Sequence, residues 1–366
     1  MIRCLYHRQF WLLLLSLLLI FPADCKPKPK PRANKRHQEP TFSDISFGHV
    51  FDPIAPNSLG KETSPQVSVF LHAAVGIFNK RRGNGTWGYG EDILKEMLHS
   101  VNSSGLLEAS TNVYIGLLGN SVDRSSAKDV ISVYSSKARV IVEADNLYFA
   151  EFPTLYMIEN YTKHFAHDDT FVLYMHSKGM RNNQAGGGPD SEGIFSWEAY
   201  NKQPAHSWRR YMQYFLVEQF AACHVLLREY GYYTVGVLKQ GAPSLYAGNF
   251  WWTTASWLKK QFSDYSLKSL EWNMGTRMKA EGMLMKGVSE DDSKKHHYCI
   301  HHTHHNMYDC ITHRDMYKNV PILPPRKNAD CFSISKDKRR VNERERKQGT
   351  SDCYLMGEKF PEIDDA

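Results

Sequence analysis

Short apolar runs alternate with amphipathic segments along the middle of the chain. The apolar runs are rich in β-branched residues and have the lengths of buried strands; they cover residues 67–78, 112–120, 138–146, 171–175 and 234–238. Helical spacing is found at residues 92–98, in a segment that begins at Pro153, and over residues 208–230. Strands that alternate with helices predict βαβ units. We therefore expect an α/β fold with a mostly parallel sheet flanked by helices over residues 65–288.

One of the apolar runs ends in a polar tip. Residues 171–175 are followed by His176, Ser177 and Lys178 before Gly179. Ligands of open α/β sheets bind outside the carboxyl ends of the strands. We therefore expect His176 and Lys178 at a ligand-facing edge, although a core strand that ends in an ordinary polar turn would give the same pattern.

A second stretch with unusual composition is AGNFWWTTASWL, residues 247–258. Gly248 and Asn249 favour backbone angles that other residues avoid. Trp251 and Trp252 are adjacent, so they cannot both face the same way. We expect core packing for them, with the alternative that one forms an aromatic wall against a flat ligand.

The first 25 residues have the features of a targeting segment. A basic start is followed by the apolar run WLLLLSLLLIF and then by the small residues Ala23 and Cys25. This pattern predicts a cleaved signal peptide and a secreted, extracellular protein. The alternative is an uncleaved type II anchor in the lumen of the endoplasmic reticulum or Golgi. No segment after residue 25 is apolar and long enough to span a membrane.

Entry into the secretory pathway gives meaning to other short motifs. Asn84, Asn102 and Asn160 each begin an Asn-x-Ser/Thr triplet, which predicts N-glycosylation. In an oxidising compartment disulfides are stable, and four cysteines near the C-terminus are candidates in an open pairing: Cys299, Cys310, Cys331 and Cys353.

The positive charge of the chain is concentrated outside the globular pattern. The formal net charge is +6, and six lysines and arginines without an acid lie within residues 26–36 of a Pro/Lys-rich arm, residues 26–64. The rest is close to neutral, which argues against a nucleic-acid partner. The arm would attract acidic polymers such as those of an extracellular matrix.

Composition changes again after residue 288. Residues 289–331 form a His/Cys-rich extension, and residues 332–366 form a charged tail. His301 and His305 are four apart and would share one helix face, where imidazoles suit zinc or copper. A solvated loop is the alternative.

The order of several pieces resembles a group of glycosyltransferases and polysaccharide-biosynthesis proteins, including the rhamnan-synthesis type. The pieces are PTL before a helix, LYMHSKG, Trp208 and Arg209 opening a helix, VGV, and YAGNFWW. In that group a strand ends in His-x-Lys, and a later Gly-Asn-x-Trp-Trp-like element precedes a helix. The helical residues 277–281 are similar to a basic-acidic helix that follows. The resemblance covers residues 67–285.

The resemblance implies a GT-A-like, Rossmann-like fold that transfers a sugar from a nucleotide-sugar to a hydroxyl group of a glycan acceptor. His176 and Lys178 would contact the diphosphate. Glu281 or Glu271 would act as the base. Gly248, Asn249, Trp251 and Trp252 would also belong to the substrate-binding site, where the two tryptophans would shape the sugar pocket. The alternatives without a functional role are that Lys178 is a solvated turn residue and that Glu281 is a helix-surface charge paired with Arg277.

One departure concerns the divalent cation. GT-A enzymes hold a metal with Asp-x-Asp at a strand end, but the corresponding strand here ends in His-Ser-Lys. Asp168 and Asp169 precede that strand, and Glu143 and Asp145 end an earlier one; either pair could hold the metal, although neither matches the Asp-x-Asp position. The enzyme could work without a metal, with Lys178 in place of the cation. The opposing hypothesis is a secreted, non-catalytic matrix glycoprotein with a degenerate glycosyltransferase fold.

Overall fold

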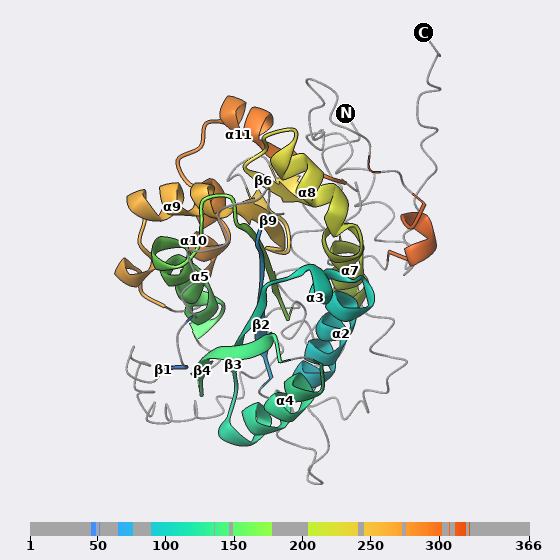
Figure 1. Ribbon diagram of the computed structural model, residues 1–366, viewed down its shortest axis with the longest axis vertical. Helices are drawn as coiled ribbons and strands as arrows, with labels where there is room; N and C mark the ends of the chain where they lie inside the picture. The colour runs from blue at the N-terminus through green and yellow to red at the C-terminus, as the bar shows by residue number, and fades with distance from the viewer. Residues whose placement is uncertain are drawn as a thin grey trace, which may run out of the picture. The chain divides into compact units, whose positions relative to one another are not determined.

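An eight-stranded sheet runs through the part of the chain that the computed structural model describes, in the order β1-β4-β3-β2-β5-β9-β6-β10 (Figure 1). The described residues are 45–48, 51, 65–75, 89–134, 136–145, 149–177, 204–240, 245–272, 276–301, 307, 312–319 and 322. By its contacts the chain divides into residues 1–39 and 40–366. All described residues belong to the second unit.

The strands are short and buried. The sheet contains β1 (Ile45–Phe47), β2 (Val67–Ala74), β3 (Asn112–Leu118), β4 (Ala138–Ala144), β5 (Phe171–His176), β6 (Thr234–Gly236), β9 (Trp251–Thr254) and β10 (His297–Cys299). β7 (Lys239–Gln240) and β8 (Leu245–Tyr246) form a separate antiparallel pair. In the large sheet β1 and β9 run antiparallel to their neighbours, and the other pairings are parallel. The expected α/β fold with a mostly parallel sheet is confirmed.

Helices cover both faces of the sheet (Figure 1). One face packs against α2 (Tyr89–Ser103), α4 (Ser121–Tyr134), α7 (Pro204–Gln213) and α8 (Phe220–Arg228). The other face packs against α5 (Phe152–His164), α9 (Ala255–Asp264) and α10 (Arg277–Glu281). Shorter elements are α3 (Leu106–Ala109), η6 (Leu267–Ser269), η7 (Met283–Met285), α11 (Glu290–His296) and η8 (Arg314–Met316).

The alternation of side chains along β2 shows how the two cores form. Val69 and Leu71 point into the core on the α2 side, and Phe70 points into the core on the α5 side. Because successive strand residues face opposite sides of a sheet, a strand that is covered on both sides must be apolar at every position. This explains the continuous apolar runs of the sequence.

Three local expectations need correction. The first apolar run leaves the strand after Ala74, earlier than residue 78. The helical pattern at 208–230 is interrupted by a π-helical turn, η5 (Tyr214–Glu218), between α7 and α8. The histidine-rich stretch does not continue as a helix through its first half, because β10 pairs there with β6.

No helix among the described residues is long and apolar enough to cross a membrane.

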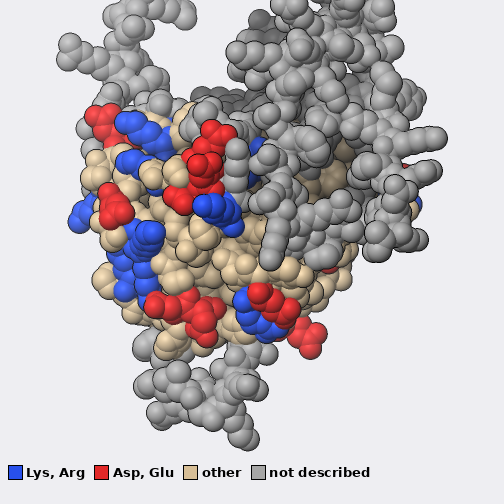
Figure 2. Space-filling model, turned by 90° about the horizontal axis from the view of Figure 1, so that it is seen from above, with Lys and Arg blue, Asp and Glu red and all other residues tan. Residues whose placement is uncertain are grey.

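The surface carries charges of both signs. In the view from above, lysines and arginines lie beside aspartates and glutamates over the described surface (Figure 2). Interspersed charges of this kind are common on soluble domains and do not create a strong field of one sign.

Candidate functional site

The carboxyl ends of β2 and β5 lie side by side and carry one histidine each. His72 and His176 occupy paired positions in this parallel register. Both are almost fully buried, with 3% and 6% of their surface exposed. Paired positions on neighbouring strands face the same side of the sheet, here the side covered by α5. The predicted location of His176 at the carboxyl end of a strand agrees with the structure.

A buried carboxylate at the start of α5 organises this edge. Glu151 is the residue before the helix, and Pro153 fixes the first turn behind it. The Tyr174 hydroxyl donates to Glu151 Oε2 over 3.0 Å, and Asn249 Nδ2 donates to the same oxygen. Trp251 Nε1 in turn donates to Asn249 Oδ1 over 2.9 Å. Glu151 is 4% exposed, so these donors replace the water that the carboxylate has lost.

His176 is held between this carboxylate and a backbone carbonyl. Its Nε2 donates to Gly248 O over 2.7 Å, and its Nδ1 lies 3.6 Å from Glu151 Oε1. Both ring nitrogens therefore face protein groups. The geometry makes His176 a positioning residue that joins the end of β5 to the turn before β9.

The turn before β9 depends on unusual backbone angles. Gly248 has φ of 93° and Asn249 has φ of 53°, both in the left-handed region. A Cβ on Gly248 would come within 2.4 Å of Met212 Sδ. Glycine tolerates the left-handed angle and also leaves room for Met212. The unusual backbone angles expected for Gly248 and Asn249 are confirmed. The result is that one turn supplies an acceptor to His176 and a donor to Glu151.

His72 is anchored from the opposite side of the same cluster. Its Nδ1 bonds to Thr154 Oγ1 at 2.9 Å. Thr154 can approach the sheet because Gly116 faces it; a Cβ there would lie 2.0 Å from Thr154 Oγ1. Burial lowers the pKa of His72 to about 3, although the nearby Glu151 charge opposes the shift. The ring is therefore neutral at physiological pH.

The acidic candidate for a base lies next to this cluster. Glu281 is 8% exposed and forms an ion pair with Arg277 within α10. The pKa of Tyr174 is raised well above its usual range, mainly by burial, then by the charge of Glu151, and also by the charge of Glu281. Tyr174 therefore keeps its proton and stays a donor to Glu151. The structure brings Glu281 toward the cluster, already paired with Arg277.

The other predicted site residues lie elsewhere. Trp252 faces the opposite core, where its Nε1 donates to Leu216 O over 2.6 Å, and only Trp251 faces the cluster. Both indoles are at most 1% exposed, so neither is open to a ligand and the core expectation holds. Glu271 is exposed. Lys178 lies outside the described residues.

Three of the four carboxylates considered for a metal, those of Asp168, Glu143 and Asp145, are paired with lysine or arginine side chains of the same chain. Asp168 and Asp169 precede β5, at the edge opposite His176, and Asp168 is 2.7 Å from Lys259 Nζ. At the end of β4, Glu143 contacts Arg124 at 3.1 Å and Lys128 at 2.7 Å. Arg124 also pairs with Asp145. Among the described residues no group of three or more His, Cys, Asp or Glu could hold a metal.

The C-terminal extension contributes a packed histidine. The Tyr211 hydroxyl bonds to His301 Nδ1 at 2.5 Å, and the His301 ring stacks on Phe215 with centroids 4.6 Å apart. His301 follows β10 and is not in a helix, so the proposed shared helix face is wrong for it. His305 lies outside the described residues, as do Cys310, Cys331 and Cys353. Cys299 is half-buried.

The predicted glycosylation sites differ in accessibility. Asn102 is exposed near the end of α2, and Asn160 is half-buried on α5. Asn84 lies outside the described residues. An oligosaccharide needs an exposed attachment point, so Asn102 is the better placed of the two.

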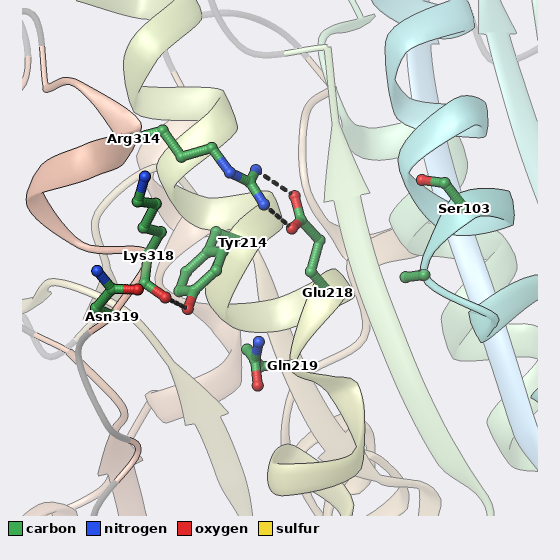
Figure 3. A pocket seen from close by; sticks show the side chains of 8 residues that line it. Ser103, Tyr214, Glu218, Gln219, Arg314, Lys318 and Asn319 are labelled. Carbon is green, nitrogen blue, oxygen red and sulfur yellow. Dashed lines mark hydrogen bonds and ion pairs between the residues drawn. The ribbon is translucent and has the colours of Figure 1, made fainter.

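Two cavities lie away from the histidine cluster. The first, of about 490 Å³, lies between the end of α2, η5 and η8 (Figure 3). There Arg314 forks onto Glu218, and the Tyr214 hydroxyl donates to Lys318 O, so its polar groups are largely engaged with each other. The second, of about 430 Å³, lies between α9 and α11.

Three residues of the cluster were missed in the sequence: His72, Glu151 and Tyr174. A signal existed for two of them. His72 is a polar residue within an apolar strand, and Glu151 directly precedes a helix that Pro153 begins. Their meeting depends on the order of strands in the sheet, which no local pattern contains.

Comparison with known proteins gives only distant matches. No family model matches this chain, and no curated protein matches its sequence. The chain is similar to 4-diphosphocytidyl-2C-methyl-D-erythritol synthase from Anaerococcus prevotii DSM 20548, at 10% identity and a TM-score of 0.35, covering 65% of this chain and 87% of that one. It is also similar to Rv0371C of Mycobacterium tuberculosis H37Rv, solved in complex with manganese, at 9% identity and a TM-score of 0.31, covering 64% and 89%. Similarity at this level assigns neither activity nor ligand to this chain.

Proposed function

We propose that this chain is a glycosyltransferase-like protein of the secretory pathway that binds a nucleotide-sugar at the carboxyl edge of its sheet. The observation that carries the proposal is the buried polar cluster at the ends of β2 and β5, where Glu151 and His176 fix the strand end. Lys178 follows two residues later in the sequence. A phosphate-contacting lysine needs rigid support, and the cluster fixes the strand end that precedes Lys178 in the sequence.

The proposed reaction is the transfer of a sugar to an acceptor hydroxyl. The hydroxyl oxygen bonds to the anomeric carbon, the bond from that carbon to the diphosphate oxygen breaks, and the nucleoside diphosphate leaves with the electron pair. The Lys178 ammonium group would stabilise the negative charge on the leaving group. Glu281 would accept the hydroxyl proton as general base, with Arg277 keeping its side chain in place.

A divalent cation does not fit four of the described carboxylates near the strand ends. Asp168, Glu143 and Asp145 are each paired with a lysine or arginine of the same chain. Glu151 accepts hydrogen bonds from Tyr174 and Asn249. Since a metal would have to displace these partners, we derive no step through a cation and assign the charge stabilisation to Lys178.

The test is release of nucleoside diphosphate from a panel of nucleotide-sugars, with and without Mn²⁺. We expect release from at least one donor, loss of release in Lys178→Ala, and no change in Lys268→Ala, an exposed lysine on η6. Circular dichroism confirms that each variant is folded. Absence of nucleoside diphosphate release from every donor would exclude glycosyltransferase activity.

The second candidate function is a secreted, non-catalytic glycoprotein of the extracellular matrix. It is favoured because both nitrogens of His176 and the Glu151 carboxylate are used to hold the fold. In this case calorimetry would detect no nucleotide-sugar binding, while the arm at residues 26–64 would retain the protein on an acidic polysaccharide column. Mass spectrometry of the mature N-terminus then distinguishes a cleaved signal peptide from an anchor.

A further inference from the structure

The second cavity lies at the edge of the sheet opposite the histidine cluster. Its lining includes Tyr233, which directly precedes β6, His297, which begins β10, and Trp257, in the first turn of α9. β6 and β10 are parallel and start side by side, with Thr234 paired to His297. We call this cavity of about 430 Å³ the amino-edge pocket.

His297 in this pocket has a defined tautomer. The Tyr246 hydroxyl donates its single hydrogen to Tyr298 O over 2.9 Å, so it accepts from Thr234 Oγ1, 2.9 Å away. Thr234 Oγ1 thereby has no hydrogen left for His297 Nδ1, which lies 2.7 Å from it. Nδ1 must carry the proton and donate, and Nε2 is then a bare acceptor.

Among the described residues, the Nε2 atom of His297 finds no hydrogen-bond partner, although the residue is only 2% exposed. A buried acceptor without a donor is unfavourable, because it has lost the hydrogen bonds that water would give it. Protonation does not remove the problem, because burial first, and then the Lys239 charge, lower the pKa of His297 to about 3. The acceptor is therefore available to a donor, either a water molecule or a hydroxyl of a bound ligand that displaces the water.

The remaining lining consists of rings and balanced charges. The Tyr233 ring stacks on Trp257 and on His296, with centroids 4.6 Å apart in each pair. Lys260 and Lys286 lie at the pocket together with Asp264 and Asp292, two charges of each sign. A lining without net charge gives no preference to a phosphate or to a cation.

We propose that the amino-edge pocket binds a neutral, hydroxyl-rich ring such as one sugar unit of a glycan. A sugar hydroxyl would donate to His297 Nε2, the aspartates would accept from further hydroxyls, and the apolar part of the sugar would contact the exposed edge of the Tyr233 ring, because Trp257 and His296 cover its two faces. The first cavity differs in that its arginine, glutamate and tyrosine are already paired with protein groups (Figure 3).

The test uses the full chain and neutral disaccharides, namely lactose, maltose and chitobiose. Saturation-transfer NMR and tryptophan fluorescence titration report binding. We expect saturable binding of at least one disaccharide and at least tenfold weaker binding by Tyr233→Ala. Tyr230→Ala is the matched control, because Tyr230 is exposed and does not line the pocket. The Tyr233 backbone oxygen that accepts from Thr253 is kept in the variant.

Two further probes separate this proposal from other ligands. Uridine and inorganic phosphate are titrated in parallel, and we expect neither to compete with the disaccharide. Absence of disaccharide binding, equal binding by Tyr233→Ala and Tyr230→Ala, or displacement by phosphate would each overturn the proposal. The proposed transfer site lies at the opposite edge of the sheet and is tested by release of nucleoside diphosphate. A failure of disaccharide binding can therefore be told apart from a failure of the transfer.

Discussion

Asn249 and Glu151, 98 residues apart in the sequence, are joined by a buried hydrogen bond from the amide to the carboxylate. The bond ties the turn before β9 to the start of α5, the two segments that flank the histidine pair. Tyr174 donates to the same carboxylate oxygen from the strand between them. Three elements therefore meet at one acid.

The first prediction concerns this acid. Glu151→Gln replaces one acceptor oxygen by a donor group that faces the Asn249 amide and the Tyr174 hydroxyl. We expect a loss of about 1–3 kcal/mol in the free energy of unfolding, measured by denaturant titration. Glu108→Gln, at an exposed glutamate of α3, should change it by less than about 0.5 kcal/mol. Equal effects of the two variants would contradict the structural role of Glu151.

The second prediction separates backbone strain from steric overlap. Gly105 and Gly248 both have positive φ, but a Cβ on Gly105 meets nothing within 4 Å, whereas one on Gly248 meets Met212. We expect Gly105→Ala to cost about 1–2 kcal/mol and Gly248→Ala about 2–4 kcal/mol because overpacking is added. Thermal unfolding of both variants gives the comparison. A cost for Gly248→Ala no larger than that for Gly105→Ala would show that Met212 moves freely.

The third prediction concerns a buried ion pair between α7 and α2. Arg209 has no exposed surface and binds Glu96 through Nε at 3.0 Å and Nη2 at 2.8 Å. Removing one charge by Arg209→Met leaves the other buried, at a cost of about 3–5 kcal/mol. The double variant Arg209→Met/Glu96→Met should be less destabilised than Arg209→Met, as judged by denaturant titration. A double variant that is worse than the single one would refute this account.

The same pair should contribute to acid unfolding. Burial alone would raise the pKa of Glu96, but the Arg209 charge and the hydrogen bonds from His206 and Arg209 hold it well below its usual value of 4.5. The unfolded chain binds the proton first as pH falls, so the stabilisation is present above about pH 4.5 and is lost below it.

The fourth prediction concerns a second acid-sensitive group, His224. Burial, and then the Arg228 charge, lower the pKa of His224 to about 4, and no residue in the described part of the chain bonds to its Nε2. Since the unfolded state takes up a proton near pH 6.5, stability is full above that pH and falls as pH approaches 4. His224→Phe should reduce the loss between pH 7 and pH 4.5 by about 1–3 kcal/mol. An unchanged pH profile of unfolding would exclude His224 as the cause.

The features that could be predicted from the sequence are those with a local physical cause. A strand buried on both faces needs a continuous apolar run, which made β3 and β5 visible. Left-handed backbone angles favour glycine and asparagine, which identified Gly248 and Asn249. The polar tip after β5 likewise located His176 at a strand end.

Features that depend on tertiary contacts were not predictable in this way. Which of Trp251 and Trp252 faces the cluster is decided by the register of β9 against β5. Glu151 reaches Tyr174 only because β4 and β5 are separated by two other strands and α5 crosses between them. The histidine-rich stretch has helical spacing, but its first residues pair with β6 and form a strand. Tertiary pairing of this kind outweighs the local preference for a helix.

Within the described sheet, β9 joins two groups of strands. It pairs antiparallel with β5 on one side and with β6 on the other, and β10 is attached only through β6. Among the described strands, β6 and β10 are therefore linked to the other five strands of the sheet through this four-residue strand. Because Asn249 lies two residues before β9, the segment that closes the sheet also carries the amide that bonds to Glu151 in the histidine cluster.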